Sequence, residues 1–268
     1  MPELPEVEQV RKTLAPHIEG KKIKNVEVFL PRLVKYPSPE LFAKKLAGRT
    51  IEKVNRRGKY LLLETDRGTL VVHLRMTGAL VVSDVEPPYA KVKFDLTDGV
   101  KLWFTDIRTF GTLYFVDDDY VIEGLATLGP EPLSKELTPE YLATLAAKSR
   151  KPIKTFILDQ TVIAGLGNIY ADECLALSGI SPLRLANAVQ TKEFPKLVEA
   201  INKVIAQGIK NHGTTFRDYK DGEGKKGNNQ NFLLVYGRGG EPCKKCGCKL
   251  EKTKVGGRGT VYCPNCQK

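Results

Sequence analysis

The residues with the clearest chemical potential stand at the start of the chain, which begins Met1-Pro2-Glu3. If Met1 is removed, Pro2 presents a free secondary amine with a carboxylate beside it. An α-amine has a pKa of about 7.7–8.0, against about 10.4 for a lysine, so more of it is neutral and nucleophilic near pH 7. Because chain ends usually fray, this amine could act only if the fold held it in a cleft.

The same stretch has a simpler, structural interpretation. Pro5 suits the first turn of a helix, and Glu6 and Glu8 suit the positive end of the helix dipole. Apolar residues recur on one face of this helix at Val7, Val10, Leu14 and Ile18. The acidic start could therefore be helix capping and nothing more, in a helix that anchors the terminus against a core.

Two pairs of cysteines near the other end have the spacing of a zinc site. Cys243-x2-Cys246 and Cys263-x2-Cys266 are separated by 16 residues, which matches a four-thiolate zinc ribbon. Cys248 competes as a ligand, but it lacks the two-residue gap that the two pairs share. Four thiolates leave no open position for water, so we expect one structural Zn²⁺ with a hairpin between the pairs.

The charge balance favours a polyanionic partner. The 268 residues include 42 lysines and arginines against 31 acidic residues, a formal net charge of +11, which is typical of nucleic-acid-binding proteins. A generally basic solvated surface is the alternative, and no basic amphipathic helix points to a membrane. Arg258, between Gly257 and Gly259 in the expected hairpin, could contact phosphate or be an ordinary exposed arginine.

Short alternating runs over the first half of the chain predict an antiparallel sandwich or barrel. The expected strands are 23–29, 50–56, 60–65, 69–74, 79–83, 91–96, 101–105 and 112–116. A helix is expected at about 39–46 among them. Beyond a linker rich in proline, further helices are expected at about 140–148, 151–160, 169–178 and 192–210.

Two segments that contain glycine could contact a ligand. Residues 165–168 read Gly-Leu-Gly-Asn before an expected helix, so Asn168 could cap that helix and the free amides could take a phosphate. A tight turn between helices is the simpler alternative, and no preceding strand supports a dinucleotide fold. Residues 218–230 are polar, with three glycines, which is typical of a mobile loop that a ligand orders.

The length favours two domains. No run of about 18 apolar residues could span a membrane, and the charged N-terminus lacks the apolar centre of a signal peptide. We therefore expect a soluble, intracellular protein.

Seven stretches taken together resemble the bacterial formamidopyrimidine-DNA glycosylases. They are MPELPEVE at 1–8, RRGKY at 56–60, HLRMTG at 73–78, DIRTFG at 106–111, AGLGNIY at 164–170, VYGR at 235–238, and the zinc ribbon. Any one of them could be accidental, but the set in this order is specific and covers essentially the whole chain.

The resemblance implies an α+β fold with DNA bound between its domains. An N-terminal antiparallel β-sandwich with flanking helices would span residues 1–125, followed by a linker at 126–138. A helical domain with a helix-two-turn-helix motif and a lesion-capping loop would span 139–239, and a zinc-ribbon β-hairpin 240–268. The implied partner is damaged double-stranded DNA with the lesion nucleotide everted, bound by a monomer in the bacterial cytoplasm.

The implied activity is excision of oxidised purines, such as 8-oxoguanine and formamidopyrimidines, followed by β,δ-elimination at the abasic site. By resemblance, Pro2 forms a Schiff base with the sugar C1′, and Glu3 donates and accepts protons. Lys59 and Arg258 match positions credited with proton donation in the elimination steps. Binding of phosphate alone is the safer role for both, because arginine is a poor proton donor at neutral pH.

Other matched residues would contact the DNA. Met76, Arg108 and Phe110 match the residues that fill the gap left by the everted nucleotide, where an apolar wedge replaces lost stacking and a guanidinium can bind the widowed base. Core packing is the alternative for Met76 and Phe110. His73, Asn168 and Tyr236 match positions near the phosphates that flank the lesion. Arg217 and Tyr219 match the lid over the everted base. Arg150 or its neighbour Lys151 matches another basic position of the family.

Two departures and two alternatives stay open. Thr109 stands where the family usually has a basic residue, and residues 87–90 lack a histidine-containing segment, so two DNA contacts are in doubt. An endonuclease VIII-like glycosylase for oxidised pyrimidines shares the architecture, although Leu4 and the wedge residues favour the purine enzyme. A non-enzymatic zinc-ribbon DNA-binding protein would explain the charge and the cysteines, but not the N-terminus or the wedge.

Overall fold

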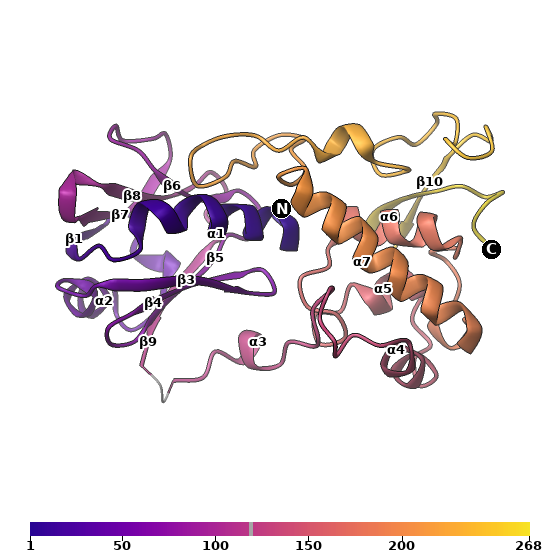
Figure 1. Cartoon of the computed structure of the whole chain (residues 1–268), viewed down its shortest axis with the longest axis horizontal. Helices are drawn as coiled ribbons and strands as arrows, with labels where there is room; N and C mark the ends of the chain where they lie inside the picture. The colour runs from indigo at the N-terminus through magenta and orange to yellow at the C-terminus, as the bar shows by residue number, and fades with distance from the viewer. Residues whose placement is uncertain (118–119) are drawn as a thin grey trace. The chain divides into compact units, whose positions relative to one another are not determined.

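The structure, a computed structural model, describes residues 1–117 and 120–268 and contains two compact units (Figure 1). The first unit comprises residues 1–126 together with 211–228, and the second comprises 127–210 together with 229–268. The segment 211–228, which follows the longest helix in sequence, therefore packs with the N-terminal part of the chain. Each unit is described below by itself.

The first unit is built on two β-sheets. Its strands are β1 (Ile23–Val28), β2 (Val34–Tyr36), β3 (Ile51–Arg57), β4 (Tyr60–Thr65), β5 (Thr69–His73), β6 (Gly78–Val82), β7 (Ala90–Leu96), β8 (Lys101–Asp106) and β9 (Thr112–Val116). One sheet has the order β1-β7-β8-β6 and the other β2-β9-β5-β4-β3. The sandwich predicted from the alternating pattern is confirmed. One pairing departs from the antiparallel pattern, because β2 runs parallel to β9.

Two helices cover the edges of these sheets. Helix α1 (Leu4–Ile18) packs against β3 and β6, the edge strands on one side, and α2 (Pro39–Leu46) packs against β1 and β2, the edge strands on the other. Unpaired strand edges invite association with other chains, so this placement protects the sandwich. The fully buried Val7, Val10 and Leu14 join α1 to the common core. The N-terminal helix predicted from the apolar spacing is thus confirmed.

The second unit is mainly helical. Its helices are α4 (Pro139–Ala146), α5 (Ile153–Ile157), α6 (Asn168–Ser178) and α7 (Phe194–Lys210), while the short α3 (Glu123–Ala126) belongs to the first unit. Helix α5 is shorter than the expected 151–160, because the chain turns after Leu158. Gly208 lets α7 approach α6 closely, since a Cβ there would lie 2.6 Å from the ring of Tyr170. Residues 127–138, within the expected linker, contain neither helix nor strand.

The chain ends in a β-hairpin formed by β10 (Glu251–Val255) and β11 (Arg258–Tyr262). Gly256 and Gly257 connect the strands with φ angles of 56° and 75°, a left-handed conformation that glycine adopts without strain. Arg258 is exposed directly after this turn, as the sequence predicts.

Short 3-10 helices complete the description at Pro31–Leu33, Thr97–Gly99, Ala186–Ala188, Thr191–Glu193 and Asn229–Phe232. Among the residues that the structure describes, no helix combines the length and apolar character needed to cross a bilayer.

Candidate functional site

The start of the chain is held in place rather than frayed. Pro2 is buried, and Glu3, only 2% exposed, caps α1. The backbone N–H of Glu3 donates to Oε2 of Glu6 at 2.8 Å, and the reciprocal bond from the backbone of Glu6 completes a capping box. The capping interpretation is therefore correct for the local structure. It also holds Pro2 directly before the first turn of α1, so the start of the chain is ordered.

Glu6 joins this terminus to the segment 211–228. Its other oxygen, Oε1, accepts the backbone N–H of Thr214 at 2.7 Å, and the carboxylate is 1% exposed. Gly213 leaves the room for this contact, because a Cβ there would lie 2.9 Å from Cγ of Glu6. The hydroxyl of Tyr219 lies 3.3 Å from the backbone oxygen of Glu6, and burial raises the pKa of Tyr219 well above its usual value. The sequence predicted a supporting role for Glu6 but not its distant partners.

The segment 211–228 is also fixed at its far end. The N–H of Gly222 donates to the hydroxyl of Thr13 on α1 at 2.8 Å, and its carbonyl accepts from Val82 on β6 at 2.9 Å. Arg217 is exposed between the two fixed ends. A cavity of about 430 Å³ lies within the first unit, bordered by residues 217–224 and by β6. Thr77, Tyr89 and Ile107 also line it.

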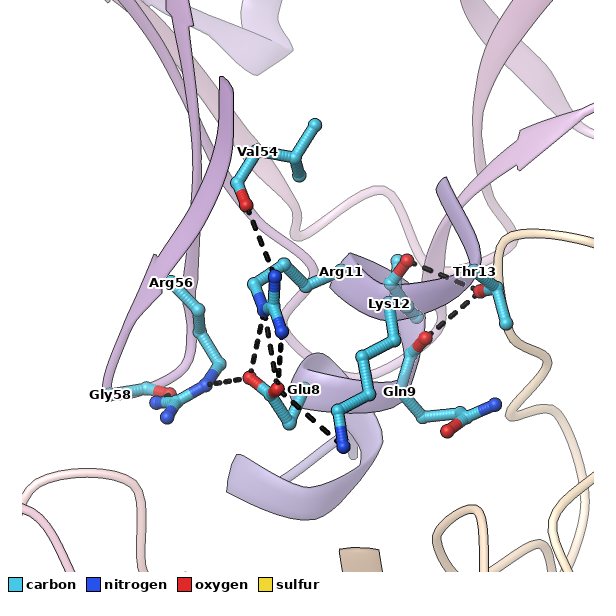
Figure 2. Close-up of polar contacts among 9 residues, drawn as sticks. Glu8, Gln9, Arg11, Lys12, Thr13, Val54, Arg56 and Gly58 are labelled. Atoms are coloured by element: carbon cyan, nitrogen blue, oxygen red, sulfur yellow. Dashed lines mark hydrogen bonds and ion pairs between the residues drawn. The ribbon is translucent and has the colours of Figure 1, made fainter. Parts of the chain in front are cut away.

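Glu8 fixes the turn that carries Lys59. Its carboxylate lies between two guanidinium groups (Figure 2). Nη2 of Arg11 donates to it at 2.7 Å and Nε of Arg56 at 3.1 Å. Burial raises the pKa of Glu8, but its hydrogen bonds to Arg11 and Arg56 outweigh this effect and lower the pKa. Arg56 also donates to the carbonyl of Gly58 at 2.9 Å, so it bridges α1 to the β3–β4 turn. Lys59 follows directly and is 7% exposed.

His73 lies at the end of β5, beneath the loop that carries Met76. Its Nδ1 accepts the backbone N–H of Arg75 at 3.0 Å, so a neutral ring carries its proton on Nε2. Its ring meets Tyr60 edge-on, with centroids 4.5 Å apart. Burial, and then the charges of Arg75 and Lys59, lower the pKa of His73 from 6.5 to about 3. His73 is therefore neutral at physiological pH, with an N–H donor to offer a phosphate.

The lowered pKa of His73 predicts acid sensitivity. The unfolded chain binds the proton near pH 6.5 and the folded chain only near pH 3, so stability falls as the pH drops between these values. The loss is about 2 kcal/mol between pH 7 and pH 5. Urea unfolding of wild type and of His73→Asn, which keeps an acceptor, should show this difference. With only three histidines in the chain, NMR titration gives a direct check, and a His73 pKa near 6.5 would contradict the assignment.

The expected wedge residues are exposed on two neighbouring loops, 74–77 between β5 and β6 and 107–111 between β8 and β9. We call these the wedge loops. Met76 and Phe110 are 40% and 51% exposed, so the core-packing alternative is wrong. The guanidinium of Arg108 lies over the ring of Phe110, 4.9 Å from its centroid. Ile107, 49% exposed, belongs to the same apolar group and was not singled out from the sequence. Thr109, where the resemblance leads us to expect a basic residue, accepts a hydrogen bond from Arg32, so that arginine supplies positive charge beside it.

In the second unit, Asn168 has a different role from the predicted cap. Helix α6 is capped by Gly167, and Asn168 is its first residue. The side-chain amide of Asn168 instead donates to the carbonyl of Gly259 at 3.0 Å. Because Gly259 follows Arg258, Asn168 helps to fix the hairpin that carries this arginine. The amide has a second N–H for a further acceptor.

A buried ion pair supports the same hairpin. Nζ of Lys154 lies 2.6 Å from Oδ1 of Asp172, and the side chains are 0% and 1% exposed. Lys154 also donates to the backbone oxygen of Gly259 and to the hydroxyl of Thr260, at 3.0 and 2.8 Å, and Asp172 accepts the N–H of Val261. Burial raises the pKa of Asp172 to about 6, although Lys154 opposes this shift. Neither residue was identified from the sequence.

Glu173, next along α6, holds the segment of Tyr236. Its carboxylate accepts three successive backbone N–H groups, from Leu234 at 2.6 Å, Val235 at 2.9 Å and Tyr236 at 2.8 Å. Burial raises its pKa, and these three donors oppose the rise. Arg150 is exposed in the α4–α5 connection, and its side chain forms no hydrogen bond or ion pair with the described residues. Nothing in its surroundings distinguishes it as a DNA contact.

The four predicted cysteines converge on one point. The sulfur atoms of Cys243, Cys246, Cys263 and Cys266 all lie within 4.8 Å of one another, and Cys248 is outside this group. A tetrahedral zinc with Zn–S bonds of about 2.3 Å needs sulfurs about 3.8 Å apart, so the cluster fits the ion. The site holds one structural Zn²⁺ with four thiolate ligands. None of the cysteines among the described residues forms a disulfide, so all four sulfur atoms are available to the metal.

Family models divide the chain into three matched regions. Residues 1–113 match the formamidopyrimidine-DNA glycosylase N-terminal domain, 128–220 the H2TH domain of the same enzymes, and 240–268 the zinc finger found in FPG and IleRS. A sandwich with a buried N-terminal proline, an H2TH region and a four-cysteine finger define a zinc-finger DNA glycosylase. The chain belongs to the formamidopyrimidine-DNA glycosylase family.

Known relatives match over their full length. The formamidopyrimidine-DNA glycosylase of Pelotomaculum thermopropionicum is 48% identical, covering 100% of this chain and 99% of that protein, and that of Geobacillus kaustophilus is 46% identical with complete coverage of both. Lactococcus lactis Fpg in complex with DNA containing an abasic site has a TM-score of 0.93 at 38% identity, covering 99% of each chain. A MutM structure with DNA containing carbocyclic 8-oxo-G has a TM-score of 0.92 at 38% identity, with complete coverage.

Proposed function

We propose that this chain is a bifunctional DNA repair enzyme that excises oxidised purines, such as 8-oxoguanine and formamidopyrimidines, and then cleaves the abasic site. The observation that carries the proposal is the buried, capped Pro2-Glu3 start in a chain of this family. Such a terminus is a costly structural detail for a protein that only binds DNA. The non-enzymatic alternative therefore explains less of the molecule.

Pro2 is the nucleophile once Met1 is removed. Its secondary amine adds to C1′ of the everted nucleotide as the bond to the base breaks, and the amine proton leaves with the base. The C1′–O4′ bond then opens, O4′ takes a proton from an acid such as Glu3, and the nitrogen becomes a cationic iminium. The iminium withdraws electrons, so the proton on C2′ becomes acidic and β-elimination expels the 3′ phosphate. A second, δ-elimination releases the 5′ phosphate. An amide nitrogen has no available lone pair, so a chain that keeps Met1 cannot begin this sequence.

Residues of both units supply protons and hold phosphates in the proposed reaction. Glu3 lies next to the amine and exchanges protons during base release. Lys59 and Arg258 bind the phosphates on either side of the lesion, and any proton transfer by Arg258 is disfavoured by its high pKa. The N–H on Nε2 of His73 and the second amide N–H of Asn168 suit the same anionic oxygens. Tyr236, whose backbone Glu173 holds, is a further phosphate contact of the second unit.

Exposed residues on the two wedge loops hold the duplex open. Met76 and Phe110 replace the stacking that the everted nucleotide gave up, and Arg108 binds the widowed base. By resemblance, Arg217 and Tyr219 belong to a lid over the base, and the cavity that Arg217 borders supports this assignment by offering space for a base. Only the resemblance supports a contact between Arg150 and the DNA backbone. We infer that the protein works as a monomer in the cytoplasm. We also propose that its N-terminal domain spans 1–125, its linker 126–138, its helical domain 139–239 and its zinc finger 240–268.

Trapping of the iminium tests the proposed function. Borohydride reduces the iminium to a stable amine, so protein freed of Met1, incubated with a duplex containing 8-oxoguanine opposite cytosine, is expected to become covalently linked through Pro2. Peptide mapping identifies the linked residue, and the fraction that intact mass shows to retain Met1 should give no adduct. Failure of the processed protein to link would refute the Schiff base. Preferential trapping on thymine glycol would instead indicate the endonuclease VIII-like specificity.

A further inference from the structure

Asp106 is a buried carboxylate that ties the two wedge loops together. It ends β8 and is 1% exposed. Oδ1 accepts the hydroxyl of Thr77 at 2.6 Å and the backbone N–H of Arg108 at 3.2 Å, and Oδ2 accepts the backbone N–H of Gly111 at 2.8 Å. The side chain therefore binds one loop through Thr77 and both ends of the other through Arg108 and Gly111.

Thr77 closes a ring of hydrogen bonds with Asp106 and Arg108. Its hydroxyl donates to Asp106 and accepts the backbone N–H of Arg108 at 2.9 Å. A hydroxyl can donate one hydrogen bond and accept others, so the Thr77 hydroxyl joins its own loop to both Asp106 and Arg108. These two bonds set the distance between the two loops. The backbone N–H of Asp106 also donates to the carbonyl of Tyr89 at 3.1 Å, which adds a third loop to the junction.

The loop from 106 to 111 has little freedom beyond these bonds. Thr109 has a φ angle of 55°, a left-handed conformation that is unfavourable for residues other than glycine. Gly111 cannot be replaced without movement, because a Cβ there would lie 2.5 Å from Cζ of Phe104 and 3.1 Å from Oδ2 of Asp106. Arg75, in the facing loop, also has a positive φ of 54°. Strain of this kind persists only where surrounding contacts enforce it.

We propose that Thr77 and Asp106 are positioning residues for the wedge, acting through the backbone of Arg108 and the placement of Met76 and Phe110. The inference rests on the proposed function, in which these three side chains enter the duplex. Met76 directly precedes Thr77, and Phe110 directly precedes Gly111, so the hydrogen bonds fix the backbone at the base of each inserted side chain. A wedge that is already in place loses less conformational entropy when it enters the base stack.

The variants Thr77→Val and Thr77→Ser test this inference. Valine has nearly the shape of threonine but lacks the hydroxyl, so it removes both bonds at once, and serine restores them. Losing these two hydrogen bonds is expected to slow reactions that need the wedge by about tenfold or more. The serine variant should recover most of the rate. Thermal unfolding of all three proteins monitors the fold.

The substrates distinguish wedge placement from other roles of Thr77, which also lines the cavity near the lid. An abasic site has no base to contact, so its cleavage in a duplex reports the wedge alone, and cleavage of the same site in single-stranded DNA needs no wedge. We expect Thr77→Val to lose activity on both 8-oxoguanine and abasic duplexes but to match wild type on the single strand. As a direct readout, 2-aminopurine opposite the abasic site should show weaker unstacking with the valine variant.

Three outcomes would overturn the inference. The first is equal rates for wild type and Thr77→Val on every duplex. The second is an equal loss of cleavage rate on single-stranded and duplex abasic DNA. The third is a loss of rate confined to 8-oxoguanine duplexes, which would indicate that Thr77 contacts the base. Inactive wild-type protein would instead count against the proposed function, so the two failures are distinguishable.

Discussion

Replacing Glu3 with glutamine is expected to lower the rate of base excision by about 10²- to 10⁴-fold, the usual contribution of a positioned acid or base. Glutamine keeps an oxygen that can accept the N–H of Glu6, so the capping box and the position of Pro2 should survive. DNA affinity should stay within about threefold of wild type, because the exchange removes a proton carrier rather than a contact. Single-turnover excision of 8-oxoguanine and fluorescence anisotropy measure the two quantities.

Two comparisons separate this effect from a change of charge or fold. Glu52→Gln makes the same substitution at an exposed position on β3 and should behave as wild type. On a preformed abasic site, where the base has already left, Glu3→Gln should still give a borohydride adduct because the amine of Pro2 is intact. An unchanged excision rate in Glu3→Gln would refute the acid–base role. Loss of the adduct together with excision would point to displacement of Pro2.

Elements with a regular pattern of their own could be predicted from the sequence. β4 reads Tyr-Leu-Leu-Leu-Glu-Thr, and the sequence identified its bounds as the structure has them, Tyr60–Thr65. A helix was likewise predicted at about 39–46, and α2 spans Pro39–Leu46, where the side chain of Ser38 caps its start. β2 was missed: its three residues are too few to show a period, and they pair in parallel with β9, far along the chain.

Chemistry that depends on residue type and short spacing could also be predicted. The cysteine pairs define their own turns, so the zinc ligands followed directly from the sequence. Buried charges that act across long separations could not. Asp172 gives no local sign that Lys154 will be its partner, and the further bond from Lys154 to Thr260 spans 106 residues. Such pairs form only when helices and hairpin have packed.

The role of Asn168 shows the same limit at a single residue. A polar residue after glycine and before a helix is a good capping candidate, yet the backbone at Gly167 already serves as the cap. The side chain is thereby released to reach Gly259, 91 residues later. The carbonyl of Gly259 also accepts a hydrogen bond from Lys154, so the hairpin is held by two donors from the helical part of this unit. Only the packed structure brings these distant groups together, so local sequence preference could not predict the contact.

Removal of zinc is expected to abolish tight DNA binding while the β-sandwich stays folded. Structural zinc supplies about 10–16 kcal/mol to small zinc units, more than a hairpin of this size can replace. Without it the hairpin loses its order, and Arg258 is no longer held by the bonds from Asn168 and Lys154 to Gly259. Chelation and Cys263→Ser should therefore both weaken DNA binding by a hundredfold or more, on the order of 3 kcal/mol.

The single tryptophan of the chain makes the division between the two units measurable. Trp103 lies in β8 and is 3% exposed, so its fluorescence reports the sandwich and not the zinc hairpin. We expect its emission to stay unchanged when zinc is removed, while anisotropy shows the loss of DNA binding. Cys248→Ser, outside the cluster, should keep one zinc per chain and full affinity. Intact binding by the metal-free protein would show that the hairpin holds Arg258 without its metal, and a red shift of Trp103 would show that the zinc supports the sandwich as well.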